Sequence, residues 1–162
     1  MTNYKNGFAV KFAAVGDLSR INELRAQVHE IHAVGKPEIF KPGFPDVLRD
    51  YVFEIWNDPK KNIVVAESEE GIVGFAVLNH ITRPETPYMY ERDYLDIDEF
   101  GVDERFRRRG AASAMIAFIR EYAVSQDFSR VELNVWGFND DALAFYEQAG
   151  FTTYRRYMEM KL

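Results

Sequence analysis

The junction at Arg107–Ser113 constrains this chain more than any other segment, because an apolar strand ends there and a helical pattern begins. The small residues Gly110, Ala111 and Ala112 let the backbone come close to a ligand. The first N–H groups of the following helix point outward without intrahelical partners, and the helix dipole favours an anion beside them. The segment therefore predicts a site for a phosphorylated ligand.

Other interpretations of the same junction are weaker or depend on context. On its own, the sequence Arg-Arg-Arg-Gly is more often a solvated basic turn at the start of a helix. A kinase-type phosphate loop is disfavoured because no Lys-Ser/Thr follows the glycine. A dinucleotide fingerprint is disfavoured because Gly-x-Gly-x-x-Gly is missing. The choice between an anion site and a basic turn therefore depends on the rest of the chain.

Charge and composition limit the partners of the protein. Its 162 residues carry a net charge of −6, which does not attract nucleic acid or an anionic membrane. The negative electrostatic field of the protein suits a cationic partner such as an amine better. The absence of cysteine excludes disulfides, thiolate zinc sites and a cysteine nucleophile. Residues 1–8 lack the pattern of a signal peptide, and no apolar stretch approaches the ~20 residues that span a bilayer. We therefore expect a cytoplasmic protein.

Hydrophobic periodicity predicts a single domain, 1–162, of the α/β (α+β) class. Helices are expected after the caps Asp17 and Asp46, from Gly110, and over 142–149. Strands are expected at 8–14, 63–66, 72–78, 88–102, 131–135 and 151–161. The order is βααβββαβαβ, which indicates one mixed sheet with helices on both of its faces.

Two motifs carry a resemblance to a known family. Residues 102–112 fit the pattern Val-x-x-x-x-Arg/Gln-x-x-Gly-x-Gly/Ala, and residues 139–151 fit Asn-x-x-Ala-x-x-Phe-Tyr-x-x-x-Gly-Phe. With these motifs the chain resembles the GNAT superfamily of acyl-CoA-dependent N-acetyltransferases. It departs from the usual pattern at Glu104, where proline is common, and at Ala112, where glycine is common. The resemblance implies a GNAT fold, a splayed strand pair that binds CoA, and acetyl-CoA as cosubstrate without a metal.

The same resemblance implies where acetyl-CoA binds. The N–H groups around Gly110 would hold the pyrophosphate, the strand backbone at Phe100 and Val102 would pair with the pantetheine arm, and Asn139 would hydrogen-bond that arm. From the residues alone, Gly101 has a packing role as an alternative, and Asn139 is as naturally a helix cap. The expected cofactor-binding residues are Phe100, Gly101, Val102, Arg107, Arg108, Arg109, Gly110, Ala111, Ala112, Ser113, Asn139, Ala142 and Tyr146.

Tyr146 is the expected catalytic acid, because a phenol can protonate the thiolate that leaves a thioester. The resemblance implies that Tyr146 lies close to the thioester. Without it, a Phe-Tyr pair on a short helix more often packs in the hydrophobic core. The expected base is Asp98, with Glu99 close behind, because the attacking amine must lose a proton. Strand alternation puts these two acids on opposite faces unless a bulge intervenes. Alternatively, the acids only line a cleft that attracts cations.

The acceptor side of the site carries no transferable motif. By analogy with GNAT relatives, the first two helices and their loop form a wall for the acceptor, although its aromatic residues are as naturally core. His29 and His32 lack a third metal ligand, so we expect no metal site. The expected substrate-binding residues are His29, His32, Phe40, Phe44, Tyr90 and Asp98.

The hypothesis from the sequence is an N-acetyltransferase that transfers acetyl from acetyl-CoA to a primary amine of a small molecule by direct attack. One alternative is a protein or peptide acceptor, at an N-terminus or a lysine. A second alternative is a non-catalytic acyl-CoA-binding regulatory module, which would need neither Tyr146 nor an acidic strand. A homodimer is expected from the family resemblance alone. The sequence does not identify the amine that accepts the acetyl group.

Overall fold

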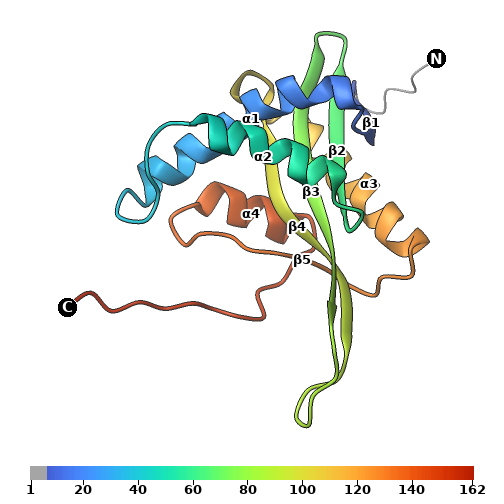
Figure 1. Ribbon diagram of the computed structural model, residues 1–162, viewed down its shortest axis with the longest axis vertical. Helices are drawn as coiled ribbons and strands as arrows, with labels where there is room; N and C mark the ends of the chain where they lie inside the picture. The colour runs from blue at the N-terminus through green and yellow to red at the C-terminus, as the bar shows by residue number, and fades with distance from the viewer. Residues whose placement is uncertain (1–6) are drawn as a thin grey trace.

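The computed structural model describes residues 7–162, so the expectation of no leader at residues 1–8 falls mostly outside the described residues. These residues form a sheet in the order β1-β2-β3-β4-β5 (Figure 1). The first four strands pair antiparallel, and β5 pairs parallel to β4. The strands are β1 (Ala9–Phe12), β2 (Lys61–Ser68), β3 (Gly71–Arg83), β4 (Arg92–Val102) and β5 (Val131–Leu133). The expected mixed sheet is therefore confirmed.

Helices cover both faces of the sheet, as predicted (Figure 1). They are α1 (Leu18–Gly35), α2 (Asp46–Asn57), α3 (Ala111–Ser125) and α4 (Asp140–Gln148), with 3-10 turns η1 (Val15–Asp17) and η2 (Glu104–Phe106). On the α1 and α2 face, Ile21 and Val52 pack on Phe75. On the α3 face, Ile119 packs on Ala76 and Leu95. Because alternate residues of β2 and β3 point to opposite faces, both layers are buried.

The β3–β4 pair is a long hairpin that extends beyond the helices (Figure 1). The sequence predicted a strand over 88–102, but β4 begins at Arg92, and residues 84–91 form the loop at the end of the hairpin. Pro84 and Pro87 lie in this loop, and proline cannot donate to a strand ladder. None of the described helices is both long and apolar enough to cross a membrane.

A bulge and a short partner strand shape the middle of β4. Val77 pairs with Glu99 and Leu78 with Ile97, so Asp98 is an extra residue in β4. β5 pairs only with Leu95–Ile97 of β4. Beyond Ile97, the outer edge of β4 has no strand beside it within residues 7–162. This is the splayed strand pair that the resemblance implied.

The closing strand predicted over 151–161 is wrong for this structure. Residues 152–162 are extended and exposed but pair with no other described strand, and the end of the chain leaves the body (Figure 1). β5 has only three residues and offers too short an edge for a partner of that length. Ion pairs of Glu159 with Lys36 (2.5 Å) and of Lys161 with Glu38 (3.6 Å) tie the end of this segment to residues just after α1.

Candidate active site

The turn before α3 has the geometry that the sequence predicted for an anion site. Gly110 has φ +97°, in the left-handed region, and no side chain caps the helix. The first helical hydrogen bond runs from Ala114 N–H to Gly110 O (3.0 Å), so the N–H groups before it are free of that ladder. A Cβ placed on Gly110 would meet nothing within 4 Å. The space in front of the turn is therefore open to a ligand that needs close backbone approach, and the turn fits a pyrophosphate.

Asp103 fixes the chain that leads into this turn. It is 1% exposed and accepts hydrogen bonds from Arg105 N (3.0 Å) and Arg105 Nη2 (3.0 Å). Arg20 of α1 also donates to it. These hydrogen bonds, those of Arg105 first, hold the pKa of Asp103 well below its usual range. Sequence reasoning missed this role, although Asp is a favoured residue at helix N-caps.

The free edge of β4 lies between the turn and α4. Its residues Phe100–Val102 pair with β3 on one side only, so the other side is available to a ligand. Gly101 has a packing role as well, because a Cβ there would lie 2.5 Å from Val28 and 2.9 Å from Phe75. The glycine lets α1 sit close to the sheet.

Tyr146 lies beside this free edge. Its ring meets Phe100 edge-on with centroids 5.9 Å apart, and it also contacts Phe145 and Phe151. Burial raises the pKa of Tyr146 to about 12, so the phenol keeps its proton at neutral pH. A protonated, half-buried phenol at this position can act as a general acid. Asn139 caps α4 by accepting a hydrogen bond from Ala142 N–H (3.2 Å), which is the role that its sequence position suggested.

The carboxylates of β4 differ in their surroundings. Glu99 is held by Arg25, with Nε–Oε2 at 2.7 Å and Nη2–Oε1 at 3.0 Å, so both of its oxygens are engaged. Asp98 is exposed at the bulge. Asp96 is half-buried, and its burial first, then repulsion by Asp98 and Glu132, raises its pKa to about 6. Asp96 is therefore the carboxylate best matched to a base near neutral pH, and sequence reasoning did not select it.

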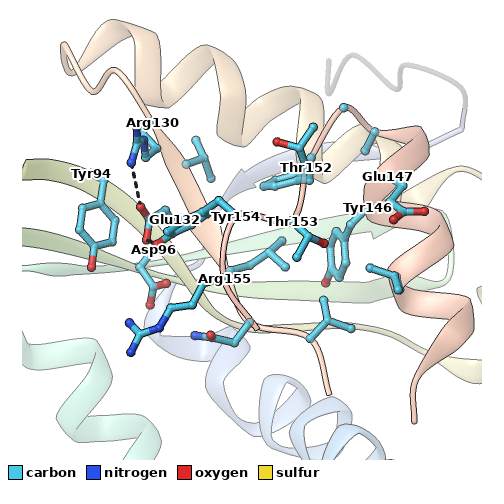
Figure 2. Close-up of a pocket in the computed structure, with 18 of the residues that line it drawn as sticks. Tyr94, Asp96, Arg130, Glu132, Tyr146, Glu147, Thr152, Thr153, Tyr154 and Arg155 are labelled. Carbon is cyan, nitrogen blue, oxygen red and sulfur yellow. Dashed lines mark hydrogen bonds and ion pairs between the residues drawn. The ribbon is translucent and has the colours of Figure 1, made fainter. Parts of the chain in front are cut away.

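A cleft of about 1950 Å³ contains both Asp96 and Tyr146. Figure 2 shows them on opposite sides of it, with Glu132 and Arg130 beside Asp96. Glu132 lies 3.6 Å from Arg130 and accepts a hydrogen bond from Tyr154 OH (2.7 Å). A carboxylate with a raised pKa and a protonated phenol thus share one cavity.

An aromatic wall stands at the end of α1, and it includes four of the residues predicted to bind the acceptor. We use this term for the side chains of His29, His32, Phe40, Phe44, Trp136 and Phe138. Trp136 and Phe138 were not foreseen, because their loop has no periodic pattern. Tyr90 is not part of the wall: it is 88% exposed in the loop at the end of the β3–β4 hairpin. In the described chain, no group of three His, Asp or Glu side chains is placed to hold a metal.

The comparisons agree with this geometry. The sequence matches the model of the acetyltransferase (GNAT) family over residues 25–151. The chain belongs to the GNAT family. It is 32% identical to human N-acetyltransferase 8 over 87 residues, which are 54% of this chain and 37% of that protein. The match therefore spans well under half of that relative.

Two solved structures illustrate the likeness of the fold. A variant of the BH1408 protein from Bacillus halodurans has a TM-score of 0.90 and 28% identity, with 94% of this chain and 98% of that chain covered. The aminoglycoside N-acetyltransferase AAC(6')-Iy, in a complex with CoA, has a TM-score of 0.74 and 17% identity, with 96% and 94% covered. At that identity the second structure supports the fold alone.

Proposed function

We propose that this GNAT protein transfers acetyl from acetyl-CoA to a primary amine of a small molecule, by direct attack within a ternary complex. One observation carries the proposal: the free edge of β4 leads toward the open turn at Gly110, and Phe100 of that edge contacts the ring of the protonated Tyr146. An anion site, an extended backbone edge and an acid thus follow one another along a single line.

The chain's own groups would hold acetyl-CoA along this line. The N–H groups of Arg108–Ser113 bind the pyrophosphate, and the positive charge of Arg107–Arg109 assists them. The backbone of Phe100–Val102 pairs with the pantetheine arm as an added strand would. This orientation brings the thioester to Tyr146 and accounts for much of the rate, because it converts an encounter of two molecules into a positioned pair.

Asp96 and Tyr146 would then move the protons. Acetyl-CoA supplies the activated acetyl group. Asp96, whose pKa is about 6, takes the proton that the amine must lose as its nitrogen bonds to the carbonyl carbon. Tyr146 gives its proton to the sulfur as the C–S bond breaks, and regains one from solvent. Asp98 and Glu99 remain sequence predictions for the base; the ion pair of Glu99 with Arg25 favours Asp96 over it.

Tyr146→Phe tests the assigned chemistry. It should lower kcat by about a hundredfold, the usual contribution of a general acid, and leave the affinity for acetyl-CoA within about twofold. Tyr88→Phe is the matched control, because Tyr88 is 85% exposed in the loop at the end of the β3–β4 hairpin and does not line the cleft. Full turnover in Tyr146→Phe would show that the acid is elsewhere.

The same assay separates the alternatives. Thiol release with peptides but not with small amines would favour a protein or peptide acceptor. Binding of acetyl-CoA without transfer to any amine would favour a regulatory module. A homodimer stays a prediction, to be measured by sedimentation.

A further inference from the structure

We propose that the acceptor of this enzyme is an arylalkyl monoamine: a primary amine with a single positive charge on a flat aromatic body, whose ring lies against the aromatic wall. The inference rests on the proposed function, because it names the substrate class of the same site. It is carried by two independent features of the cleft, the arrangement of its rings and the balance of its charges.

The rings of the wall come from three separate segments that fold to one place. His32 of α1 stacks on Phe40 of the α1–α2 loop, with centroids 5.1 Å apart and planes at 27°. Phe40 meets Trp136 edge-on at 5.1 Å. Phe138 lies so close to the end of α1 that a Cβ on Gly35 would stand 2.2 Å from its ring, so only glycine allows this packing.

The wall borders the groups that carry the chemistry. Trp136 and Phe138 line the same cleft as Asp96 and Tyr146. Trp136 is 37% exposed, so part of its indole surface is open to a ligand. An aromatic ring placed there gains stacked or edge-on contacts, which an aliphatic chain of equal size does not make as well.

The charges around the wall leave room for one ammonium group. Glu99 is neutralised by Arg25, and Glu132 lies 3.6 Å from Arg92 and from Arg130. Among the described carboxylates that line the cleft, Asp96 and Glu147 form no ion pair. Asp96 is half-buried, whereas Glu147 is exposed and lies on the Tyr146 side of the cleft (Figure 2), so Asp96 is the one that can hold an ammonium group away from solvent.

The histidines and cations do not add sites for further positive charge. Burial first, and then repulsion by His29, lowers the pKa of His32, so its ring is neutral at neutral pH. Among the described residues, Arg120, Arg155 and Arg156 also line the cleft without an ion pair and would repel a polycation. An aminoglycoside, which carries several ammonium groups, would therefore find one half-buried carboxylate partner, Asp96, and several repulsive neighbours.

Three amines separate these properties in a thiol-release assay with acetyl-CoA. Phenethylamine has one charge and a flat ring, cyclohexylethylamine has one charge and a puckered ring, and sisomicin is a polycation. We expect kcat/KM for phenethylamine to exceed that for either of the others by about tenfold or more, consistent with the loss of a few aromatic contacts. Equal or better use of sisomicin or cyclohexylethylamine would overturn the inference.

Two variants test the wall directly. Trp136→Ala should raise KM for phenethylamine by about tenfold with little change in kcat, because it removes binding and not proton transfer. Trp56→Ala is the matched control: Trp56 is also 37% exposed, but it lies on α2 and does not line this cleft. Phe138 also lines the cleft, and Phe138→Leu keeps much of the apolar volume while removing the ring, so it should also raise KM if Trp136→Ala fails to fold.

The outcomes distinguish this inference from the proposed function. Acetylation of sisomicin but not of phenethylamine, or an unchanged KM in both folded variants, refutes the arylalkyl monoamine and leaves acetyl transfer standing. Thiol release with neither these three amines nor a wider panel of primary amines, in a protein that binds acetyl-CoA, refutes the proposed function itself.

Discussion

Replacing Gly110 by alanine should weaken acetyl-CoA binding far more than it weakens the fold. Gly110 has φ +97°, and a Cβ there meets nothing within 4 Å, so the substitution causes no clash in the free protein. What remains is the left-handed backbone, which costs a residue with a Cβ about 1–2 kcal/mol. The lower entropy of the unfolded alanine variant offsets about 0.4–1 kcal/mol of this. The net loss is about 1 kcal/mol, or about 2–4 °C in Tm for a domain of this size.

Gly71 provides a control with the same backbone. Its φ is +102°, and a Cβ there also meets nothing within 4 Å, but it lies in the β2–β3 turn. Gly71→Ala should therefore lower Tm by the same amount. Only in Gly110→Ala does the new methyl group enter the space in front of the α3 N–H groups, where a pyrophosphate needs close approach.

Calorimetric titration with acetyl-CoA measures the difference. We expect Gly110→Ala to raise Kd by about tenfold or more, which corresponds to about 1.4 kcal/mol, and Gly71→Ala to leave Kd unchanged. Equal Kd values for the two variants, with equal Tm losses, would refute the assignment of the turn as the pyrophosphate site.

Three further predictions concern the charged groups. Asp96 has a pKa of about 6, so kcat/KM should rise as the pH passes about 6, and Asp96→Asn should abolish that limb. A raised carboxyl pKa also destabilises the fold above that pKa, so Asp96→Asn should increase the free energy of unfolding at pH 8 and have little effect at pH 4. Because Asp96 is only half-buried, solvent screens much of this effect, and we expect a gain of about 1 kcal/mol, measured by denaturant titrations at both pH values. Glu99→Gln leaves the buried Arg25 without its counter-charge and should lower the free energy of unfolding, measured in urea, by about 3 kcal/mol. A decrease well below about 1 kcal/mol would contradict the stabilising role of this ion pair. The pKa of Asp103 is depressed, so the ionised carboxylate stabilises the fold at neutral pH, and this stabilisation is lost as the pH falls below about 4. Asp103→Asn should therefore lower Tm at pH 7, and the difference in Tm from the unchanged protein should shrink in acid. A Tm difference that is constant with pH would contradict the ionic role.

Sequence reasoning located the parts of the site that depend on local pattern. The turn at Gly110, the tyrosine of α4 and the order of the elements up to α4 all follow from spacings within a few residues. Local pattern could not select the base, because the bulge at Asp98 breaks the alternation on which the choice depended. Nor could it foresee that Glu99 is occupied by Arg25, which lies 74 residues earlier in the chain.

The remaining errors have a similar physical origin. Residues 151–161 alternate as a strand does, but alternation does not supply a partner edge, and β5 is only three residues long. Tyr90 is a different case: analogy with GNAT relatives predicts that it binds the acceptor, and this stays a prediction, but the residue lies exposed in the hairpin loop and outside the aromatic wall. Trp136 and Phe138 join the wall through tertiary packing on α1, which leaves no local signal.

Transfer of an isotope-labelled acetyl group tests the account most directly. The protein is incubated with labelled acetyl-CoA and a panel of primary amines. The amines, the released CoA and the protein are then analysed by mass spectrometry. We predict labelled N-acetyl amine and free CoA in equal amounts, with no label on the protein. Bound acetyl-CoA that yields no labelled amine, or a labelled protein that passes its acetyl group on, would contradict direct transfer at this site.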